Sequence, residues 1–261
     1  ERRNAEIVAR NLQQHWRKRK FRRIQNAFLA QLYERRRFYW QYHRRIEARS
    51  IACYLISINF LHKMIPNFKA HPWHGISVGE ECPEVVNVFI EIVPSDTIKY
   101  EVDKESGFLK VDRPQQFSNI IPALYGFVPR TYCHDEVLRL AKESGAEDVT
   151  MGDNDPLDIC VLSSHSIHSG GMLMEALPIG GFKMIDKGEA DDKIVAVMKG
   201  DHAFGHFRDI SELPQAEVKR LMHYFLTYKN LPDEPAKCTI HEVYGAEHAK
   251  KVIQASQLDY A

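Results

Sequence analysis

Glycine and proline occur only after residue 65 of this chain, and this restriction limits what each part can fold into. Pro66 is the first proline and Gly75 the first glycine, among 12 prolines and 14 glycines in 261 residues. Both residue types interrupt helices, whereas the turns between short strands depend on them. We therefore expect one or two helices in residues 1–65, a connector at 66–83 and a turn-rich domain over 84–261.

Charge divides the chain at nearly the same place. Residues 1–50 hold 15 Lys and Arg against 4 Asp and Glu, which leaves 20 basic and 31 acidic residues for the remainder. The formal net charge of zero therefore combines a segment of +11 with a segment of −11. This division predicts a basic helical extension joined to an acidic domain.

Composition excludes several classes of protein. An apolar fraction of 44% with 27% charged residues rules out wholesale disorder or a collagen-like chain. The longest nearly apolar stretch, residues 51–61, is too short for a membrane span, which needs about 20 residues. The five cysteines include no C-x-x-C pair, which argues against a disulfide framework and a structural zinc site. The chain begins with Glu1, so we expect a fragment or processed form, and a targeting signal could have preceded it.

The basic extension carries an amphipathic pattern with three open interpretations. Apolar residues recur at helical spacing over residues 21–32, between Arg and Lys residues. Residues 12–22 partly match the IQ motif that binds calmodulin-like EF-hand proteins, although Lys18 replaces its usual Gly and its closing aromatic residue is missing. The extension could be a packing or oligomer-forming helix, the target of an EF-hand protein, or a binding site for a polyanion such as an anionic membrane or nucleic acid.

Charged residues interrupt two strand-like patterns in the acidic part. Residues 85–93 are strongly β-prone, yet Glu91 shares a face with its apolar neighbours two positions away. A buried carboxylate is costly unless a cation partners it, so Glu91 either has a cation as its partner or lies on a strand rim that faces water. In residues 98–102, Lys99 and Glu101 share the polar face of a predicted hairpin. This face either is an ordinary face exposed to solvent, which the sequence alone favours, or lines a charged cavity.

Three aspartates, Asp153, Asp155 and Asp158, lie within six residues around Pro156. Such a turn concentrates the hard oxygen ligands that Mg²⁺ prefers when it works with phosphate substrates. An EF-hand loop is excluded, because it would need Gly where Asp158 stands and Glu where Ser164 stands. A phosphatase with an aspartyl nucleophile and an acidic surface turn remain as alternatives.

Further charged and phenolic groups suit a compact polyanion with divalent cations. A second carboxylate set precedes Lys193, and it consists of Asp186, Glu189, Asp191 and Asp192. The candidate phosphate-binding groups are Arg113, Tyr125 and the pair Tyr228–Lys229. The pair ends a helix predicted to begin near Pro214, where a terminal Tyr is more often a packing residue.

Five ordered blocks resemble the soluble family I inorganic pyrophosphatases over roughly residues 84–231. The blocks are DNDPLD at 153–158 and the segments 90–114, 120–132, 178–197 and 223–231. The resemblance implies a mostly β fold with flanking helices, an OB-like closed β-barrel and a homo-oligomer. The HPWHGI segment and the basic extension are most similar to the vacuolar or acidocalcisomal soluble pyrophosphatases of trypanosomatid protists. This narrower similarity implies an acidocalcisome or acidic vacuole, with the cytoplasm as the alternative.

The resemblance also implies a role for each site residue. Several Mg²⁺ ions, with Zn²⁺, Mn²⁺ or Co²⁺ as substitutes, would be held by Asp153, Asp158, Asp186 and Asp191, with Glu91 and Glu101 acting through water. Asp155 would accept the proton of the attacking water. The phosphate contacts would come from Lys99, Arg113, Tyr125, Lys193, Tyr228 and Lys229.

The implied reaction is hydrolysis of inorganic pyrophosphate to two orthophosphates. Short polyphosphates are a further expected substrate. Water is the nucleophile, so no activated Ser or Cys is needed. Two positions depart from the family: Ile121 replaces a Tyr, and Lys187 replaces a carboxylate beside a metal site. The alternative function is a scaffold or binding module, in which an OB-like barrel has lost catalysis and the basic helix recruits an EF-hand protein or polyanion.

Overall fold

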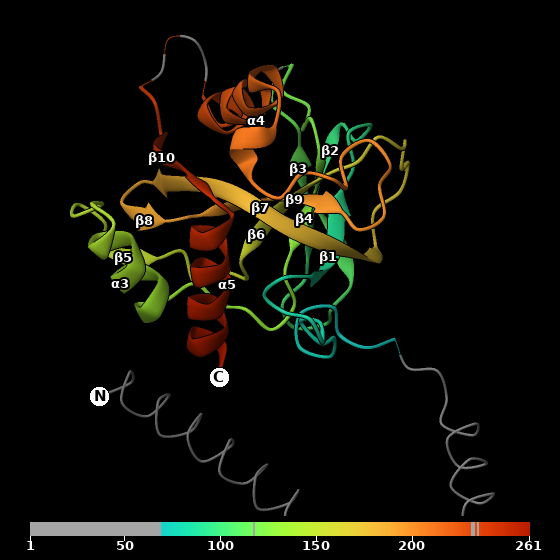
Figure 1. Ribbon diagram of the computed structural model, residues 1–261, viewed down its shortest axis with the longest axis horizontal. Helices are drawn as coiled ribbons and strands as arrows, with labels where there is room; N and C mark the ends of the chain where they lie inside the picture. Colours follow the sequence, from blue (N-terminus) through green and yellow to red (C-terminus); the bar gives the residue numbers. More distant parts are fainter. Residues whose placement is uncertain (1–68, 117, 231–232, 234) are drawn as a thin grey trace, which may run out of the picture. The chain divides into compact units, whose positions relative to one another are not determined.

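A strand-rich body is formed by the described residues, 69–261 without 117, 231–232 and 234, in this computed structural model (Figure 1). The expected helices in residues 1–65 and the first residues of the connector lie outside the described part of the chain. Within that part, no helix has both the length and the apolar character that a membrane crossing requires. The expectation of a mostly β fold with a few helices is confirmed for the described residues.

The strands and helices of the described residues all lie in the turn-rich part of the sequence. The strands are β1 (Val86–Ile92), β2 (Ile98–Val102), β3 (Leu109–Pro114), β4 (Leu124–Phe127), β5 (Met151–Gly152), β6 (Asp158–Leu162), β7 (Met172–Asp186), β8 (Glu189–Ala190), β9 (Lys193–Met198) and β10 (Cys238–Gly245). The helices are α3 (Asp135–Glu143), the short 3-10 helix η1 (Ile210–Glu212), α4 (Gln215–Thr227) and α5 (Ala246–Tyr260). The predicted strand at 85–93, the hairpin from residue 98 and the helix near Pro214 are therefore confirmed as β1, β2–β3 and α4.

Strand pairing returns to the strand at which it begins. β1 pairs with β4, β4 with β6, β6 with β9 and β9 with β7, and β7 pairs again with β1. All of these pairings are antiparallel except β6–β9, which is parallel. β8 and β10 add to the far part of β7, while β2 and β3 form a separate hairpin. Asp158 and Lys193 therefore stand at the start of two adjacent parallel strands, as register partners.

The long strand β7 links these pairings because it contacts different neighbours along its length. It pairs with β1 through its first residues, with β9 through its middle and with β10 through its last residues. Two glycines at its centre let Tyr244 approach: a Cβ on Gly181 would lie 2.6 Å from the Tyr244 ring, and one on Gly180 would lie 2.5 Å from the Tyr244 carbonyl oxygen. Larger side chains would separate β7 from β10 here.

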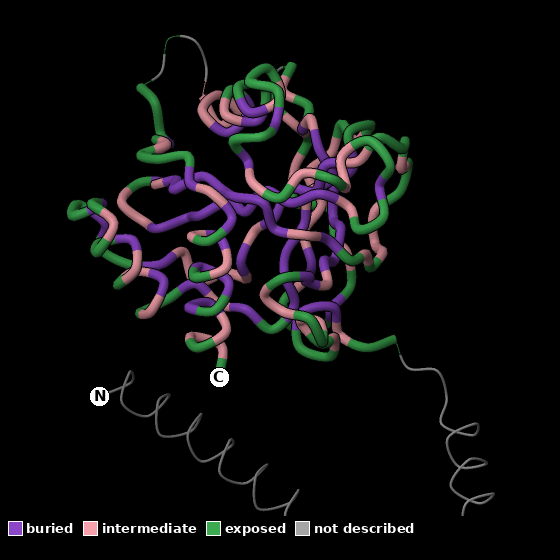
Figure 2. Tube along the Cα trace, viewed as in Figure 1, coloured by how far each residue is buried: buried purple, intermediate pink, exposed green. Residues whose placement is uncertain are grey.

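Two large apolar clusters fill most of the described body, and a smaller third cluster contains Trp73, Phe89, Val102 and Phe127. One large cluster includes Val88, Ile159 and Ile194 with apolar residues of α3 and α5, and the other includes Phe182 with apolar residues of α4. Figure 2 shows the buried trace running along the strands, while loops and outer helix turns are exposed. The cores hold the strands rigid, so side chains at the strand ends can be placed accurately.

We expect Phe182→Ala to lower the free energy of unfolding by about 3–5 kcal/mol, because its ring is fully buried and its removal leaves a cavity. Phe108→Ala is the matched control, since the Phe108 side chain is 72% exposed and should change stability by less than about 0.5 kcal/mol. Urea unfolding followed by circular dichroism measures both values. Equal losses in the two variants would contradict this placement of the core.

Candidate active site

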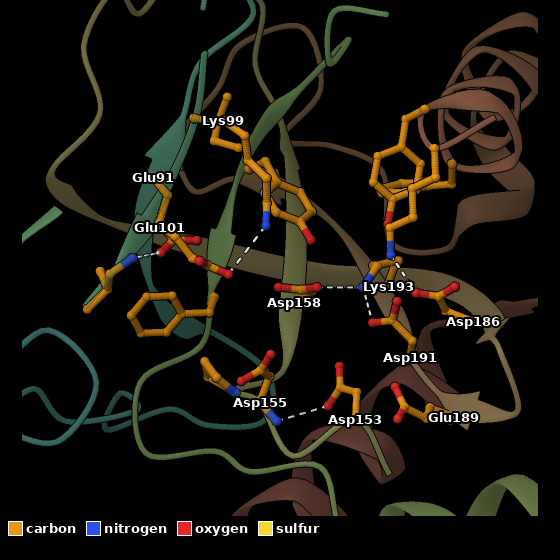
Figure 3. A pocket seen from close by; sticks show the side chains of 18 of the residues that line it. Glu91, Lys99, Glu101, Asp153, Asp155, Asp158, Asp186, Glu189, Asp191 and Lys193 are labelled. Carbon is orange, nitrogen blue, oxygen red and sulfur yellow. Dashed lines mark hydrogen bonds and ion pairs between the residues drawn. The ribbon is translucent and has the colours of Figure 1, made fainter. Parts of the chain in front are cut away.

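A polar cavity of about 200 Å³ lies among the ends of several strands, the β2–β3 hairpin and the end of α4 (Figure 3). Nearly all of the site residues expected from the sequence line it. They are Glu91, Lys99, Glu101, Tyr125, Asp153, Asp155, Asp158, Asp186, Asp191, Lys193, Tyr228 and Lys229. Segments that are far apart in the chain are thus brought to one place by the strand order.

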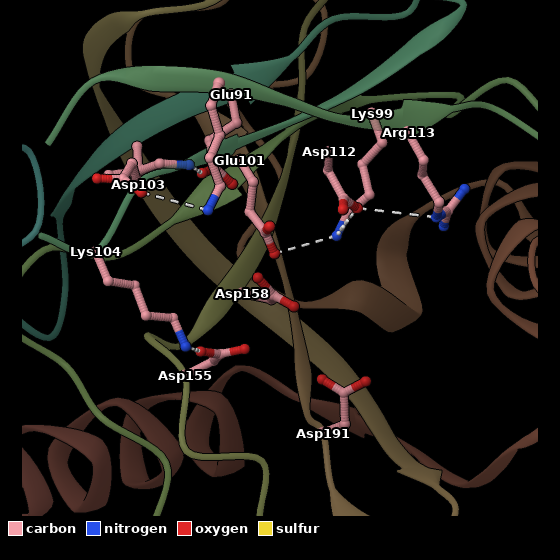
Figure 4. A network of polar contacts seen from close by, with 12 residues as sticks. Glu91, Lys99, Glu101, Asp103, Lys104, Asp112, Arg113, Asp155, Asp158 and Asp191 are labelled. Atoms are coloured by element: carbon pink, nitrogen blue, oxygen red, sulfur yellow. Dashed lines mark hydrogen bonds and ion pairs between the residues drawn. The ribbon is translucent and has the colours of Figure 1, made fainter. Parts of the chain in front are cut away.

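Arg113 is the expected site residue that does not line this cavity. It lies on β3 as the register partner of Lys99, and its Nε atom is 3.8 Å from a carboxylate oxygen of Asp112. Figure 4 shows the Asp112 carboxylate linked to both Lys99 and Arg113. Arg113 is therefore a direct neighbour of the hairpin lysine that lines the cavity.

The acidic loop 153–158 is shaped by its own sequence. Asn154 has a φ of 61°, a left-handed conformation that Asn tolerates better than most residues. The Asp155 N–H donates to the Asp153 carboxylate at 3.1 Å, and the fully buried Leu157 anchors the loop in the core. The three aspartates thereby face the cavity around a fixed turn, and Asp158 begins β6.

Lys193 supplies the central positive charge of the site. Its side chain is almost completely buried on β9, and its Nζ atom donates to Asp158 at 2.5 Å and also to Asp191. Burial alone would lower the pKa of Lys193, but the two carboxylates outweigh burial and raise this pKa well above its usual value. Lys193 therefore stays protonated and partly neutralises the acidic cluster.

The remaining carboxylates exceed what this one lysine can neutralise. Burial is the main cause that raises the pKa values of Asp153 and Asp191, and repulsion from neighbouring carboxylates adds to it. Burial also raises the pKa of Glu91 to about 8, although the Val102 N–H donates to its carboxylate at 2.6 Å. Ionising these groups together requires further cations.

The donor set fits a hard divalent cation. The side chains that line the cavity include six aspartate and glutamate residues expected as ligands and no His or Cys. Such oxygen donors select Mg²⁺ or Mn²⁺ over softer metals. Among the residues that the structure describes, however, no three His, Cys, Asp or Glu side chains are close enough to hold one ion together. The Lys193 ammonium group contacts the carboxylates of both Asp158 and Asp191.

Phenol and ammonium groups cover the side of the cavity near α4. Burial raises the pKa values of Tyr125 and Tyr228 well above the usual value, so both remain O–H donors. Tyr228 stacks on Tyr224 with 5.3 Å between ring centroids, which confirms a packing role without removing its hydroxyl from the cavity. Lys229 pairs with Asp186 at 2.5 Å. These groups provide hydrogen bonds and positive charge for an anion.

Several cavity residues were not assigned a site role from the sequence. They are Trp73, Lys104, Glu189 and Tyr224. Lys104, in the hairpin turn, donates to the Asp155 carboxylate (Figure 4). The sequence did not indicate this contact, because a lysine in a charged turn is usually exposed to solvent. Glu189 was visible only as a member of an acidic cluster. Trp73 and Tyr224 reach the cavity through tertiary packing that local patterns do not encode.

The two departures from the family pattern have different surroundings. Ile121 is buried in the apolar cluster beneath α4, where it replaces a hydroxyl-bearing ring with aliphatic packing. Lys187 lies exposed in the turn after β7, with a φ of 53°, and does not line the cavity. Its effect on the site would therefore be exerted through its charge beside Asp186.

Comparison with known proteins points to one family. The family described as "Pyrophosphatase: Inorganic pyrophosphatase" matches residues 88–261. The chain is 47% identical to the inorganic pyrophosphatase of Chlamydia muridarum over 195 residues, covering 73% of this chain and 93% of that protein. The chain belongs to the inorganic pyrophosphatase family.

The relatives of this chain extend beyond bacteria. Soluble inorganic pyrophosphatase 3 of Arabidopsis thaliana is 38% identical over 192 residues, covering 74% of this chain and 79% of that protein. The crystal structure of the Thermus thermophilus inorganic pyrophosphatase superposes with a TM-score of 0.61 at 28% identity, covering 73% of this chain and 99% of that one. The family fold therefore accounts for the strand-rich body described above.

We expect Lys193→Met to destabilise the fold by about 3–5 kcal/mol in the presence of a chelator, because it leaves the partly buried Asp158 and the buried Asp191 without their cation. Lys199→Met is the control, since Lys199 follows the same strand and forms only exposed ion pairs, worth about 1 kcal/mol or less. Urea unfolding provides the measurement. Added Mg²⁺ should reduce the difference in the free energy of unfolding between the two variants. A Lys193 variant as stable as the control would contradict this electrostatic explanation.

Proposed function

We propose that this protein hydrolyses inorganic pyrophosphate to two orthophosphates in the cavity described above. The observation that carries this conclusion is the gathering of the acidic, phenolic and ammonium groups of five separate sequence blocks in one cavity of a chain that belongs to the inorganic pyrophosphatase family. A scaffold or binding module without catalysis is not favoured, since none of the principal carboxylates is missing. No covalent intermediate is needed, because water attacks phosphorus directly.

The cavity would hold Mg²⁺ through Asp153, Asp158, Asp186 and Asp191, with Glu91 and Glu101 acting through water. Bound Mg²⁺ would supply neutralisation of the pyrophosphate charge and lower the pKa of the attacking water. The other groups act on the substrate itself. Asp155 lies 42% exposed at the cavity wall, where its carboxylate can accept a proton from that water.

Positive and hydrogen-bonding groups would stabilise the transferring and departing phosphates. Lys193 stays charged, Lys99 and Lys229 line the cavity, and Arg113 is the neighbour of Lys99 on the adjacent strand. The protonated hydroxyls of Tyr125 and Tyr228 donate to phosphate oxygens. Charge that develops on the leaving phosphate thus meets fixed donors, which is the largest contribution in many phosphoryl transfers.

We further propose the finer features that the sequence resemblance implies. The returning strand pairings support an OB-like closed barrel, and the family match from residue 88 accords with a catalytic domain at 84–261 after a connector at 66–83. The HPWHGI segment and the basic extension support a relationship to the trypanosomatid acidocalcisomal enzymes, and with it an acidocalcisome or acidic vacuole. A homo-oligomer, activity on short polyphosphates and replacement of Mg²⁺ by Zn²⁺, Mn²⁺ or Co²⁺ complete this proposal.

The basic extension, residues 1–65, lies outside the family match and contains none of the residues assigned to the reaction. Its sequence supports recruitment of an EF-hand protein or a polyanion, or packing within an oligomer. Deletion of residues 1–50 separates these roles through oligomer size, calcium response and salt-dependent retention on polyphosphate.

Asp155→Asn should lower kcat for phosphate release from pyrophosphate by about 100-fold or more, because the amide cannot accept the proton of the attacking water. The thermal midpoint should stay close to that of the unchanged protein, since Asp155 is partly exposed. Phosphate release at saturating pyrophosphate and Mg²⁺ is the measurement. Near-normal turnover in this variant would refute the assigned proton acceptor.

Removal of divalent cations with EDTA should abolish phosphate release, and added Mg²⁺ should restore it, because the carboxylates otherwise repel the substrate. The same assay with Zn²⁺, and with tripolyphosphate in place of pyrophosphate, measures metal preference and substrate range. Full activity in excess EDTA would contradict the proposed mechanism.

Lys104→Gln should lower kcat/KM for pyrophosphate by about tenfold, because it removes a cation that contacts Asp155 at the cavity wall. Lys110→Gln is the matched control: Lys110 belongs to the same hairpin, pairs with Asp103 at 3.4 Å and does not line the cavity. Equal kcat/KM values for the two variants would exclude Lys104 from substrate handling.

A further inference from the structure

Trp73 lies in the predicted connector and contributes to the active-site wall. Its ring is buried, lines the cavity and packs with Phe89, Val102 and Phe127. A residue of the connector is therefore part of the site's surroundings.

Trp73 is tied to the segment 128–133 by reciprocal hydrogen bonds. Its indole Nε1–H donates to the Thr131 carbonyl at 2.8 Å, and the Arg130 N–H donates to the Trp73 carbonyl at 2.9 Å. Thr131 is fully buried, so its carbonyl would lose a partner in a water-poor environment if the indole were removed. The position of Trp73 and that of Thr131 thus depend on each other.

The segment 128–133 in turn holds the backbone of the acidic loop. The Leu157 N–H donates to the Thr131 hydroxyl at 2.9 Å, and the Val128 N–H donates to the Leu157 carbonyl at 3.0 Å. The Cys133 N–H donates to the Asp155 carbonyl at 2.9 Å. The loop that carries the aspartates is therefore laid directly onto the segment that Trp73 fixes.

We propose that Trp73 is a positioning residue for catalysis, which holds Asp155 and its loop in place through Thr131. This inference rests on the proposed role of Asp155 in pyrophosphate hydrolysis. Displacement of a reacting group by about 1 Å can reduce turnover by about 100-fold, so a small loosening of this loop affects kcat. Binding of pyrophosphate depends on several lysines and tyrosines elsewhere in the cavity, so KM is affected less.

Trp73→Phe tests this role, because the smaller ring keeps much of the apolar packing and loses the N–H that reaches Thr131. Tyr260→Phe is the matched control. Its hydroxyl hydrogen-bonds His74 at 2.8 Å in the same aromatic cluster, and its loss leaves the bond between Trp73 and Thr131 in place. Both variants are made in the full chain and compared with the unchanged protein.

Trp73→Phe should lower kcat about tenfold with KM for pyrophosphate changed less than twofold, whereas Tyr260→Phe should leave both values unchanged. Amide hydrogen exchange in peptides covering residues 153–158 should become about tenfold faster in Trp73→Phe alone. Peptides covering β9, residues 193–198, report any general loss of stability. Equal acceleration in β9, or values matching those of Tyr260→Phe, would overturn the positioning role.

The two proposals can fail separately. If the unchanged protein releases no phosphate from pyrophosphate, the proposed function is refuted. Hydrogen exchange still reports whether Trp73 holds the acidic loop. If the unchanged protein is active and Trp73→Phe retains full kcat, the positioning role alone is refuted.

Discussion

The ammonium group of Lys193, buried between Asp158 and Asp191, is the interaction on which the site depends. It lets two carboxylates approach inside a folded protein, because its positive charge offsets their mutual repulsion. The parallel pairing of β6 and β9 places Asp158 next to Lys193, because these two residues are register partners at the starts of adjacent strands. The same strand pairing therefore determines both the order of these strands in the sheet and the position of the lysine that partly neutralises the cavity.

The surplus of carboxylates is the reason that we expect the site to attract cations. Groups such as Asp153 and Glu91 resist ionisation as long as only Lys193 and Lys99 offset them. Bound divalent ions would remove this penalty, and a substrate with several negative charges would then meet a positively charged surface. The acidic net charge of the chain after residue 50 is thus partly a property of the reaction centre.

Local sequence patterns were sufficient to predict the features that depend only on residues close together in the chain. The alternation in residues 98–102, the β-prone run at 85–93 and the apolar spacing before Tyr228 each predicted an element that is present. The acidic loop was recognisable because its ligands lie within six residues. These features need only the geometry of one strand, helix or turn.

Contacts between distant segments were harder to predict. The sequence resemblance placed Lys193 among phosphate contacts, whereas the fold also pairs it with both Asp158 and Asp191. Trp73 and Lys104 reach the cavity across 58 and 51 residues, respectively, to meet Thr131 and Asp155. No pattern within a strand or turn reports such a meeting, which depends on how the sheet and its connections pack.

The position of β9 between β6 and β7 has a consequence for the order of assembly. β9 is the last of these strands to leave the ribosome, yet it provides the neighbour for both of the others. At about 5–20 residues per second, the unpaired edges of β6 and β7 face the solvent for seconds before β9 arrives. Nascent chains of this protein should therefore be most prone to aggregate in that interval, and chaperone binding should be strongest there.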